Sequence, residues 1–214
     1  AEVKLKTWFF PNINPTKKTV ILIHGLNSSM RSPDILTSAS FLLKNGYNVL
    51  TFDLQEHGES FKPDNTYGAG KHVRDNVKAI VDWLNNVKNI YSNNISLLGI
   101  SLGSATIIEF INKYGWNDVN NIILESFVFS AFFTLVKNEI ERNNLPVTFA
   151  YTLRDFAFIF KNVNITEYGE TVYLSKLIYE LNNYKPALWI YNTNDERVPP
   201  ESSNKAILEE FFNT

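Results

Sequence analysis

The fold is decided by residues 95–114, which read ISLLGISLGSATIIEFINKY. Ile95–Gly99 is a short, nearly continuous apolar run, typical of a strand buried on both faces, whereas Leu102–Tyr114 carries apolar residues at helical spacing. Between them lies a Gly-x-Ser-x-Gly pattern centred on Ser101. A turn from strand to helix at one residue strains that residue, and flanking glycines remove side chains that would collide with neighbouring elements. The pattern therefore predicts that the Ser101 hydroxyl is exposed at the end of its strand, close to the positive end of the helix.

Buried-strand patterns alternate with helical patterns through most of the chain, as expected for a parallel sheet covered by helices. The expected strands are Val3–Phe10, Thr19–Ile23, Tyr47–Phe52, Ile95–Gly99, Asn121–Leu124 and Pro186–Tyr191. The expected helices cover residues 35–43, 73–84, 102–114 and a last segment that begins near Pro199. We therefore predict the α/β class, with a mostly parallel sheet flanked by helices.

Composition and charge exclude several classes of protein. The chain has 214 residues, no cysteine and a formal net charge of −2, so disulfide frameworks, cysteine-ligated metals and thiol nucleophiles are excluded. Lysine and arginine form no dense block, which argues against nucleic acid as a partner. The longest apolar runs fall short of the about 18 residues that a membrane span needs, so we expect no membrane span. No cluster has metal-ligand spacing, so we expect no metal.

Residues 127–185 interrupt the alternation of strands and helices, because they contain no clear buried strand and are rich in Phe and Tyr. We interpret them as an inserted cap of helices, with residues 1–126 and 186–214 forming the core domain. Phe129 and Phe133 are candidates for lining an apolar substrate pocket. A small cap must also bury aromatic side chains in order to pack, and packing explains most of them.

Further motifs, in a fixed order along the chain, carry a resemblance to a known family. They are His24-Gly25-Leu26, Asp53-Leu54-Gln55-Glu56-His57-Gly58-Glu59-Ser60, Thr66-Tyr67-Gly68, Leu124-Glu125-Ser126 and Asn194-Asp195-Glu196-Arg197-Val198-Pro199. Together with the Ser101 pattern they are similar to motifs of the α/β-hydrolases, and more narrowly of the esterase, acyl-thioesterase and serine-aminopeptidase-like branch. Gln55 and Glu56 depart from the Arg-Gly pair that is usual in the second motif.

The resemblance implies a division of catalytic roles. Ser101 would attack the substrate carbonyl carbon, and the backbone N–H groups of Leu26 and Leu102 would form the oxyanion hole. Asp195, directly after the last expected strand, would be the catalytic acid, although a solvated turn is the ordinary alternative. Glu125 is the alternative acid, or else a structural hydrogen-bond acceptor. Acyl transfer through serine needs no cofactor, so none is expected.

The base that the resemblance requires does not appear in the chain. The family places Ser, then Asp or Glu, then His, but His24, His57 and His72 all precede Ser101. The resemblance implies that His24 helps to hold the oxyanion loop and that His57 is structural, whereas we expect His72 to be exposed in the first turn of a helix. None of the three stands where the base is expected.

Two explanations of the missing base remain open. Either the chain ends before a final strand and a His-bearing loop, or the protein lacks the base and serves as a binding or scaffold module. We favour C-terminal truncation, because a decayed site gives no reason to keep a strained nucleophile turn. The chain as it stands should then be catalytically impaired, with a residual rate enhancement of about 10³–10⁴-fold over the reaction in water. It begins with Ala1 rather than Met, so the compartment stays unassigned, with the cytoplasm slightly favoured.

The function expected first is hydrolysis of a carboxylic ester or thioester of a small-to-medium apolar acyl substrate. A serine peptidase is the second enzyme hypothesis. A non-catalytic hydrolase-fold binding protein is the alternative outside enzymes, and cofactor-free lyases or haloperoxidase-like enzymes would also keep Ser101. The expected partner is therefore a small molecule, and the oligomeric state is not predicted.

Overall fold

A computed structural model describes residues 3–60, 73–126, 140, 141, 144, 146, 148, 187–191 and 194. The chain divides into two compact units, Ala1–Glu125 with Glu180–Ile190 and Ser126–Tyr179 with Tyr191–Thr214. The sheet and the Ser101 turn belong to the first unit.

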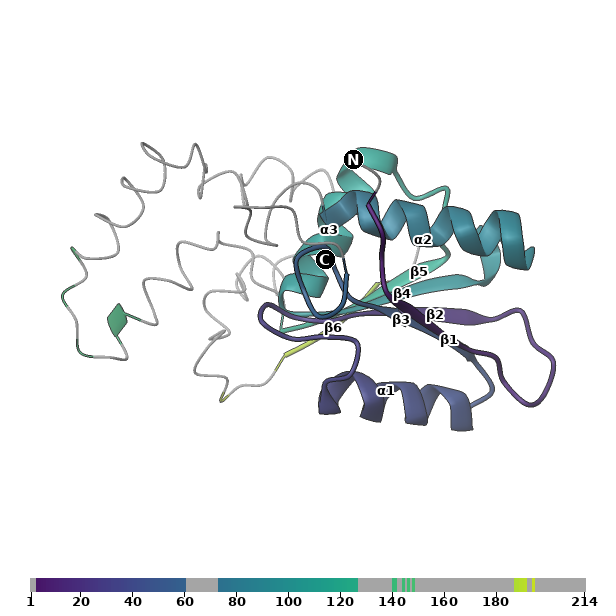
Figure 1. Cartoon of the computed structure of the whole chain (residues 1–214), viewed down its shortest axis with the longest axis horizontal. Coiled ribbons are helices and arrows are strands. Elements are labelled where there is room, and N and C mark those ends of the chain that lie inside the picture. The colour runs from purple at the N-terminus through teal and green to yellow at the C-terminus, as the bar shows by residue number, and fades with distance from the viewer. Residues whose placement is uncertain are drawn as a thin grey trace, which may run out of the picture. The chain divides into compact units, whose positions relative to one another are not determined.

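The described residues form one six-stranded sheet in the order β1-β3-β2-β4-β5-β6 (Figure 1). Its strands are β1 (Thr7–Phe10), β2 (Thr19–Ile23), β3 (Asn48–Phe52), β4 (Ile95–Ile100), β5 (Asn121–Glu125) and β6 (Ala187–Ile190). β1 runs antiparallel to β3, whereas all other neighbours are parallel. The predicted α/β class and the mostly parallel sheet are therefore confirmed.

Helices cover both faces of the sheet. They are α1 (Pro33–Lys44), α2 (Val73–Lys88) and α3 (Leu102–Tyr114), with a 3-10 turn, η1, at Ser92–Asn94. α1 lies on one face, and α2 and α3 lie on the other (Figure 1). Every residue of β2 and β3 is buried, because helices cover both faces of these two strands.

The core on the α1 side shows how the helical spacing of the sequence is used. Ile35 and Ala39 of α1 lie one turn apart on the face that meets the sheet. They pack in a buried cluster with Val20, Leu22, Val49 and Leu98. Burying one such aliphatic side chain contributes about 1.5–3 kcal/mol, so this cluster is a main anchor of α1 on the sheet.

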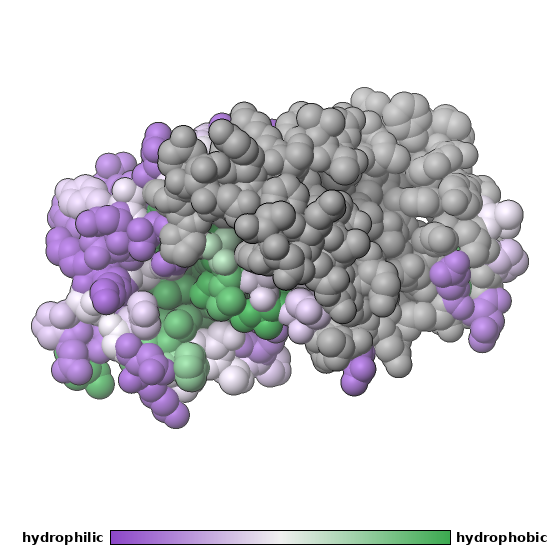
Figure 2. Space-filling model, turned by 180° about the vertical axis from the view of Figure 1, so that it is seen from behind, coloured by the Kyte–Doolittle hydropathy of each residue, from purple (hydrophilic) through white to green (hydrophobic). Residues whose placement is uncertain are grey.

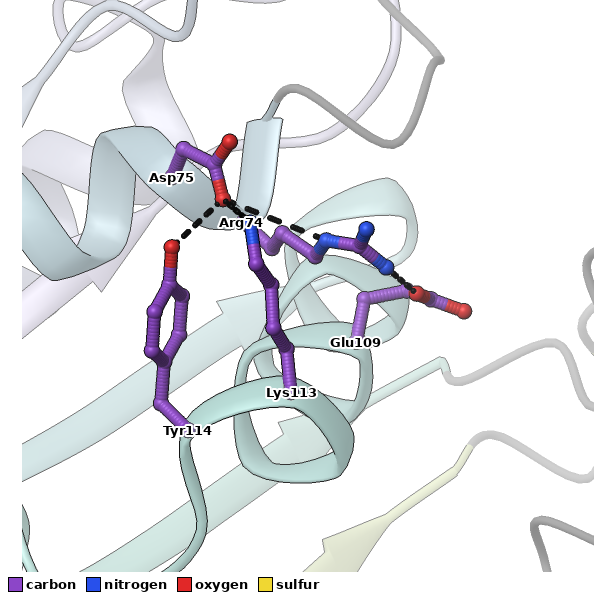
Figure 3. Close-up of polar contacts among 5 residues, drawn as sticks. All are labelled: Arg74, Asp75, Glu109, Lys113 and Tyr114. Carbon is purple, nitrogen blue, oxygen red and sulfur yellow. Dashed lines mark hydrogen bonds and ion pairs between the residues drawn. The ribbon is translucent and has the colours of Figure 1, made fainter.

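α2 and α3 are joined by a polar network (Figure 3). Asp75 Oδ1 accepts hydrogen bonds from Lys113 Nζ and from the Tyr114 hydroxyl, each at 2.7 Å. Arg74 Nη1 pairs with Glu109 Oε2 at 2.9 Å. The Asp75 side chain is 46% exposed, so solvent screening limits such pairs to about 1 kcal/mol or less.

The first strand begins later than predicted, at Thr7 rather than at Val3. The partner strand β3 ends at Phe52, which pairs with Thr7, so residues before Thr7 have no strand beside them. Lys6 instead donates its N–H to Ser60 Oγ at 2.9 Å and accepts the Asp53 N–H at 3.0 Å. The apolar alternation of the sequence carries no information on where the partner strand ends.

The predicted last strand is confirmed as β6, parallel to β5. The predicted cap, residues 127–185, and the helix expected near Pro199 lie almost wholly outside the described residues and stay predictions.

The face of the described residues seen in Figure 2 carries apolar side chains bordered by polar ones. None of the described helices is both long and apolar enough to cross a membrane.

Candidate active site

Ser101 lies at the junction of β4 and α3, where the sequence places it. Its backbone is left-handed, with φ 53° and ψ −111°, a conformation that is strained for a residue with a Cβ. Its N–H donates to the Glu125 carbonyl at 2.8 Å, and its carbonyl accepts from the Ala105 N–H at 3.2 Å. The turn is therefore fixed on one side by strand β5 and on the other by helix α3.

The two glycines of the motif allow close packing of backbones. A Cβ on Gly99 would lie 2.5 Å from the backbone nitrogen of Ser104, inside van der Waals contact. A Cβ on Gly103 would overlap the carbonyl oxygen of Ile23 in β2 and lie 2.7 Å from its carbonyl carbon. Both obstacles are backbone atoms, so the α3 N-terminus could approach β2 and β4 in this way only with glycine at both positions.

Ser104 secures this turn, a role that the sequence analysis missed. Its side chain is fully buried, and its Oγ lies 2.6 Å from the Gly99 carbonyl and 2.9 Å from the Glu125 carbonyl. One hydroxyl therefore links the ends of β4 and β5 from the first turn of α3. The signal available in the sequence was a second serine directly after the motif, in the first turn of the expected helix.

The β2–α1 loop, residues 24–32, lies beside the Ser101 turn because β2 and β4 are parallel neighbours and Ile23 pairs with Gly99. A Cβ built on Gly25 would be 3.5 Å from the Ser101 Cβ, so the two backbones are close. Leu26 follows and is 37% exposed. Leu102 is the first residue of α3, and the first N–H groups of a helix have no partner within the helix.

His24 is fully buried, and both of its ring nitrogens are used. Nδ1 lies 2.7 Å from the Gly25 carbonyl, and Nε2 accepts the Leu54 N–H at 3.1 Å. This pair of bonds fits the neutral ring with the proton on Nδ1. Burial lowers the pKa of His24, against the bond to Gly25, and nearby His57 lowers it further. These contacts agree with a structural role for His24 rather than with that of a base.

Asp53 is the second functional candidate that sequence reasoning missed. It directly follows β3 and is 1% exposed. Its carboxylate accepts the Met30 N–H at 2.7 Å and the Glu59 N–H at 2.8 Å. The motif resemblance included Asp53 but gave it no role, because one of the two donors, Met30, comes from the β2–α1 loop, 23 residues away.

Glu125, the alternative acid, ends β5 opposite Ile100, next to Ser101 in the sheet. Burial raises the pKa of its carboxyl above the ordinary value, and the charge of Asp34 at the start of α1 adds to this. Its backbone carbonyl, already bonded to Ser101 and Ser104, is the part of Glu125 that the turn uses.

The structure brings Ser101, Leu102 and the β2–α1 loop with Leu26 to one edge of the sheet, where parallel strands end. Asp195, Phe129, Phe133 and His72 lie outside the described residues, so their predicted roles stay predictions. Among the described residues, no group of three or more His, Asp or Glu side chains is placed to hold a metal ion.

A mostly parallel sheet with helices on both faces and a strained serine between strand and helix defines an α/β-hydrolase fold, and solved esterases, a bromoperoxidase and other hydrolases share it. The chain belongs to the family described as serine aminopeptidase, S33, which matches residues 14–185.

Individual relatives are distant. The structure is similar to an esterase of Pyrococcus furiosus, with a TM-score of 0.69 and 26% identity over 99% of this chain and 71% of that one. A bromoperoxidase from Bacillus anthracis gives a TM-score of 0.66 at 20% identity, over 99% and 84% of the two chains. The uncharacterized protein YqkD of Bacillus subtilis (strain 168) is 23% identical over 89% of this chain. The chain spans only 59% of the length of that Bacillus subtilis relative.

Proposed function

We propose that this protein is a serine hydrolase that cleaves a carboxylic ester or thioester of a small-to-medium apolar acyl substrate. The observation that carries the proposal is the left-handed backbone of Ser101 between β4 and α3, since this turn exposes a serine hydroxyl at the edge of the sheet. Membership of the S33 family and the likeness to an esterase at 26% identity support it.

The reaction would pass through an acyl-serine intermediate. Ser101 Oγ attacks the carbonyl carbon, and the N–H groups of Leu26 and Leu102 donate to the oxygen as it becomes negative. The alcohol or thiol leaves with a proton, and water then attacks the acyl-serine and releases the acid. In serine hydrolases, removing one oxyanion donor lowers kcat by about 10²–10³, so the placement of these two backbone groups matters as much as the nucleophile.

The roles of acid and of substrate contacts are proposed as the sequence predicts them, and no base is assigned. Asp195 keeps the role of acid, and Phe129 and Phe133 keep that of contacts to the acyl group. We do not assign His24 as the base, because it is fully buried and both ring nitrogens are engaged. The activity is therefore to be tested on the full-length gene product.

A peptidase is the second candidate, favoured by the description of the family as serine aminopeptidase. Esterases and peptidases of this type share the acyl-serine chemistry, so only substrates separate them. Aminoacyl p-nitroanilides hydrolysed faster than p-nitrophenyl esters would favour the peptidase.

The test is labelling and turnover by the full-length gene product. A fluorophosphonate should label Ser101, as read by peptide mass spectrometry, and p-nitrophenyl esters and acyl thioesters of increasing chain length should be hydrolysed. Ser101→Ala should abolish labelling and lower kcat by at least about 10³, whereas Ser40→Ala, on the exposed side of α1, should change neither. Absence of labelling in the wild-type protein contradicts the proposal and leaves the binding-module hypothesis.

A further inference from the structure

The segment that carries the Leu26 N–H lies at the surface of the molecule. Leu26 is 37% exposed and Asn27 is exposed, so burial does not hold this part of the β2–α1 loop. Asn27 also has a left-handed backbone, with φ 55°, a conformation that persists only where the surrounding structure imposes it. The position of the Leu26 N–H must therefore be set by the ends of the loop.

The start of the loop is held by His24. Its Nδ1–H donates to the Gly25 carbonyl, and its Nε2 accepts the N–H of Leu54, just beyond the end of β3. The residue before Leu26 is thereby tied to the segment that follows β3.

The far end of the loop is held by Asp53. Its buried Oδ1 accepts the Met30 N–H at 2.7 Å, and its Oδ2 accepts the Glu59 N–H at 2.8 Å. Hydrogen bonds from N–H groups to a carboxylate are stronger than those to a neutral acceptor. Residues 26–29 thus span two points that are both fixed to the chain after β3.

Two further contacts keep this carboxylate in place. Glu59 forms ion pairs on the surface with Lys6, at 3.2 Å, and with Arg31, the residue after Met30. Gly58 has φ 51°, and a Cβ on it would overlap the Asp53 carboxylate. The chain from 58 to 59 therefore closes over Asp53, and any side chain at Gly58 would displace it.

We propose that Asp53 is a positioning residue for the oxyanion hole: through Met30 it fixes the far end of the β2–α1 loop and so sets where the Leu26 N–H points. The inference rests on the proposed function and adds to it a residue that never touches substrate. The physical reason is that an N–H donor displaced by about 1 Å stabilises the developing oxyanion much less. Such a displacement can lower the rate by about 100-fold.

The experiment compares matched pairs of variants in the full-length gene product. Asp53→Asn replaces one acceptor oxygen by an amide donor that faces an N–H, and Gly58→Ala moves the carboxylate without changing it. Their controls are Asp75→Asn, which makes the same change in the α2–α3 network, and Gly46→Ala, at φ 86° with nothing within 4 Å of the added Cβ. Hydrogen exchange of residues 24–32, the midpoint of thermal unfolding, and kcat and KM for an ester are measured for all four.

We expect faster exchange in residues 24–32 and a fall in kcat of about 10- to 100-fold, with KM little changed, in Asp53→Asn and Gly58→Ala only. Unchanged exchange in both of these variants overturns the proposal. So does faster exchange with unchanged kcat, or an equal fall in kcat in Asp75→Asn, which would trace the effect to general stability. A wild-type protein that shows no turnover contradicts only the proposed function. Hydrogen exchange of residues 24–32 in the variants then still tests whether Asp53 holds the loop.

Discussion

The Ser101 turn and the β2–α1 loop lie side by side at the edge of the sheet, but they are held in different ways. The turn is fixed by residues within or next to its own motif, with Gly99 and Gly103 packed against backbone and Ser104 bonded to strand ends. The loop is fixed by bonds to residues 30 and 23 positions away, between Leu54 and His24 and between Met30 and Asp53. The groups that shape the turn of the proposed nucleophile therefore come from one short stretch of chain, residues 99–104, which packs against β2 and β5. The loop of the proposed oxyanion donor is instead held by side chains from two separate stretches, His24 and Asp53.

The largest effect should come from Gly103→Ala, which tests whether the turn depends on close packing of α3 against β2. The added Cβ would overlap the Ile23 carbonyl oxygen, and neither β2 nor α3 can move without disturbing the core. We expect a loss of about 3 kcal/mol in the free energy of unfolding, measured by urea denaturation.

The control for this variant is Gly46→Ala, after the end of α1. Gly46 has φ 86° and no atom within 4 Å of the added Cβ, so only backbone strain of about 1 kcal/mol is expected. Equal losses in the two variants would show that the overlap with Ile23 costs no more than the backbone strain at Gly46.

Ser104→Ala tests the hydroxyl that links β4 and β5. The substitution removes the buried donor to the Gly99 and Glu125 carbonyls, and losing such a bond costs about 1–2 kcal/mol of unfolding free energy. Ser40→Ala, at an exposed position of α1, should leave stability unchanged or slightly raised. A Ser104→Ala protein as stable as the wild type would mean that the backbone alone holds the turn.

The same contrast explains how much of the site could be predicted. The Ser101 turn could be read from sequence, because its cause, small residues around a serine between strand and helix, lies within a few positions. The role of Asp53 could not, because it depends on β2 and β3 being neighbours and on Gly58 bringing the chain back over the carboxylate. The late start of β1 was missed for a related reason, since the end of β3 at Phe52 determines it.

His24→Gln tests how the start of the β2–α1 loop is held, through the pH dependence of the free energy of unfolding. Burial lowers the pKa of His24 below its ordinary value of 6.5, so between these two values the unfolded chain binds the proton and the folded protein does not. The contribution of His24 to the free energy of unfolding is therefore fully present above pH about 6.5. It falls as the pH decreases toward the folded pKa, with a slope of at most about 1.4 kcal/mol per pH unit.

The difference in unfolding free energy between wild type and His24→Gln should therefore narrow as pH falls from about 7.5 to about 5.5. Urea denaturation at several pH values measures it. A difference that stays constant over this range would mean that His24 is protonated equally in both states, contrary to the neutral ring that its hydrogen bonds require.

The smallest effect is expected in the α2–α3 network, which depends neither on the turn nor on the loop. Burial acts to raise the pKa of Asp75, but hydrogen bonds from Lys113 and Tyr114 outweigh it and hold the pKa below its ordinary value of 3.8. Because the folded pKa is the lower one, the stabilisation is complete above pH about 4 and is lost as pH falls through the folded pKa. Asp75→Asn should therefore cost less than about 1 kcal/mol at neutral pH, since the side chain is partly exposed and screened.

That small loss should shrink further in acid, as urea denaturation at pH about 7 and about 3 would show. The loss of unfolding free energy in Asp75→Asn is also the reference value for the loss in Asp53→Asn. The two aspartates undergo the same substitution, but Asp53 is 1% exposed and bonds two backbone N–H groups, whereas Asp75 meets only side chains at the surface. A larger loss of unfolding free energy in Asp75→Asn than in Asp53→Asn would contradict the stronger hold that burial and two backbone donors give to Asp53.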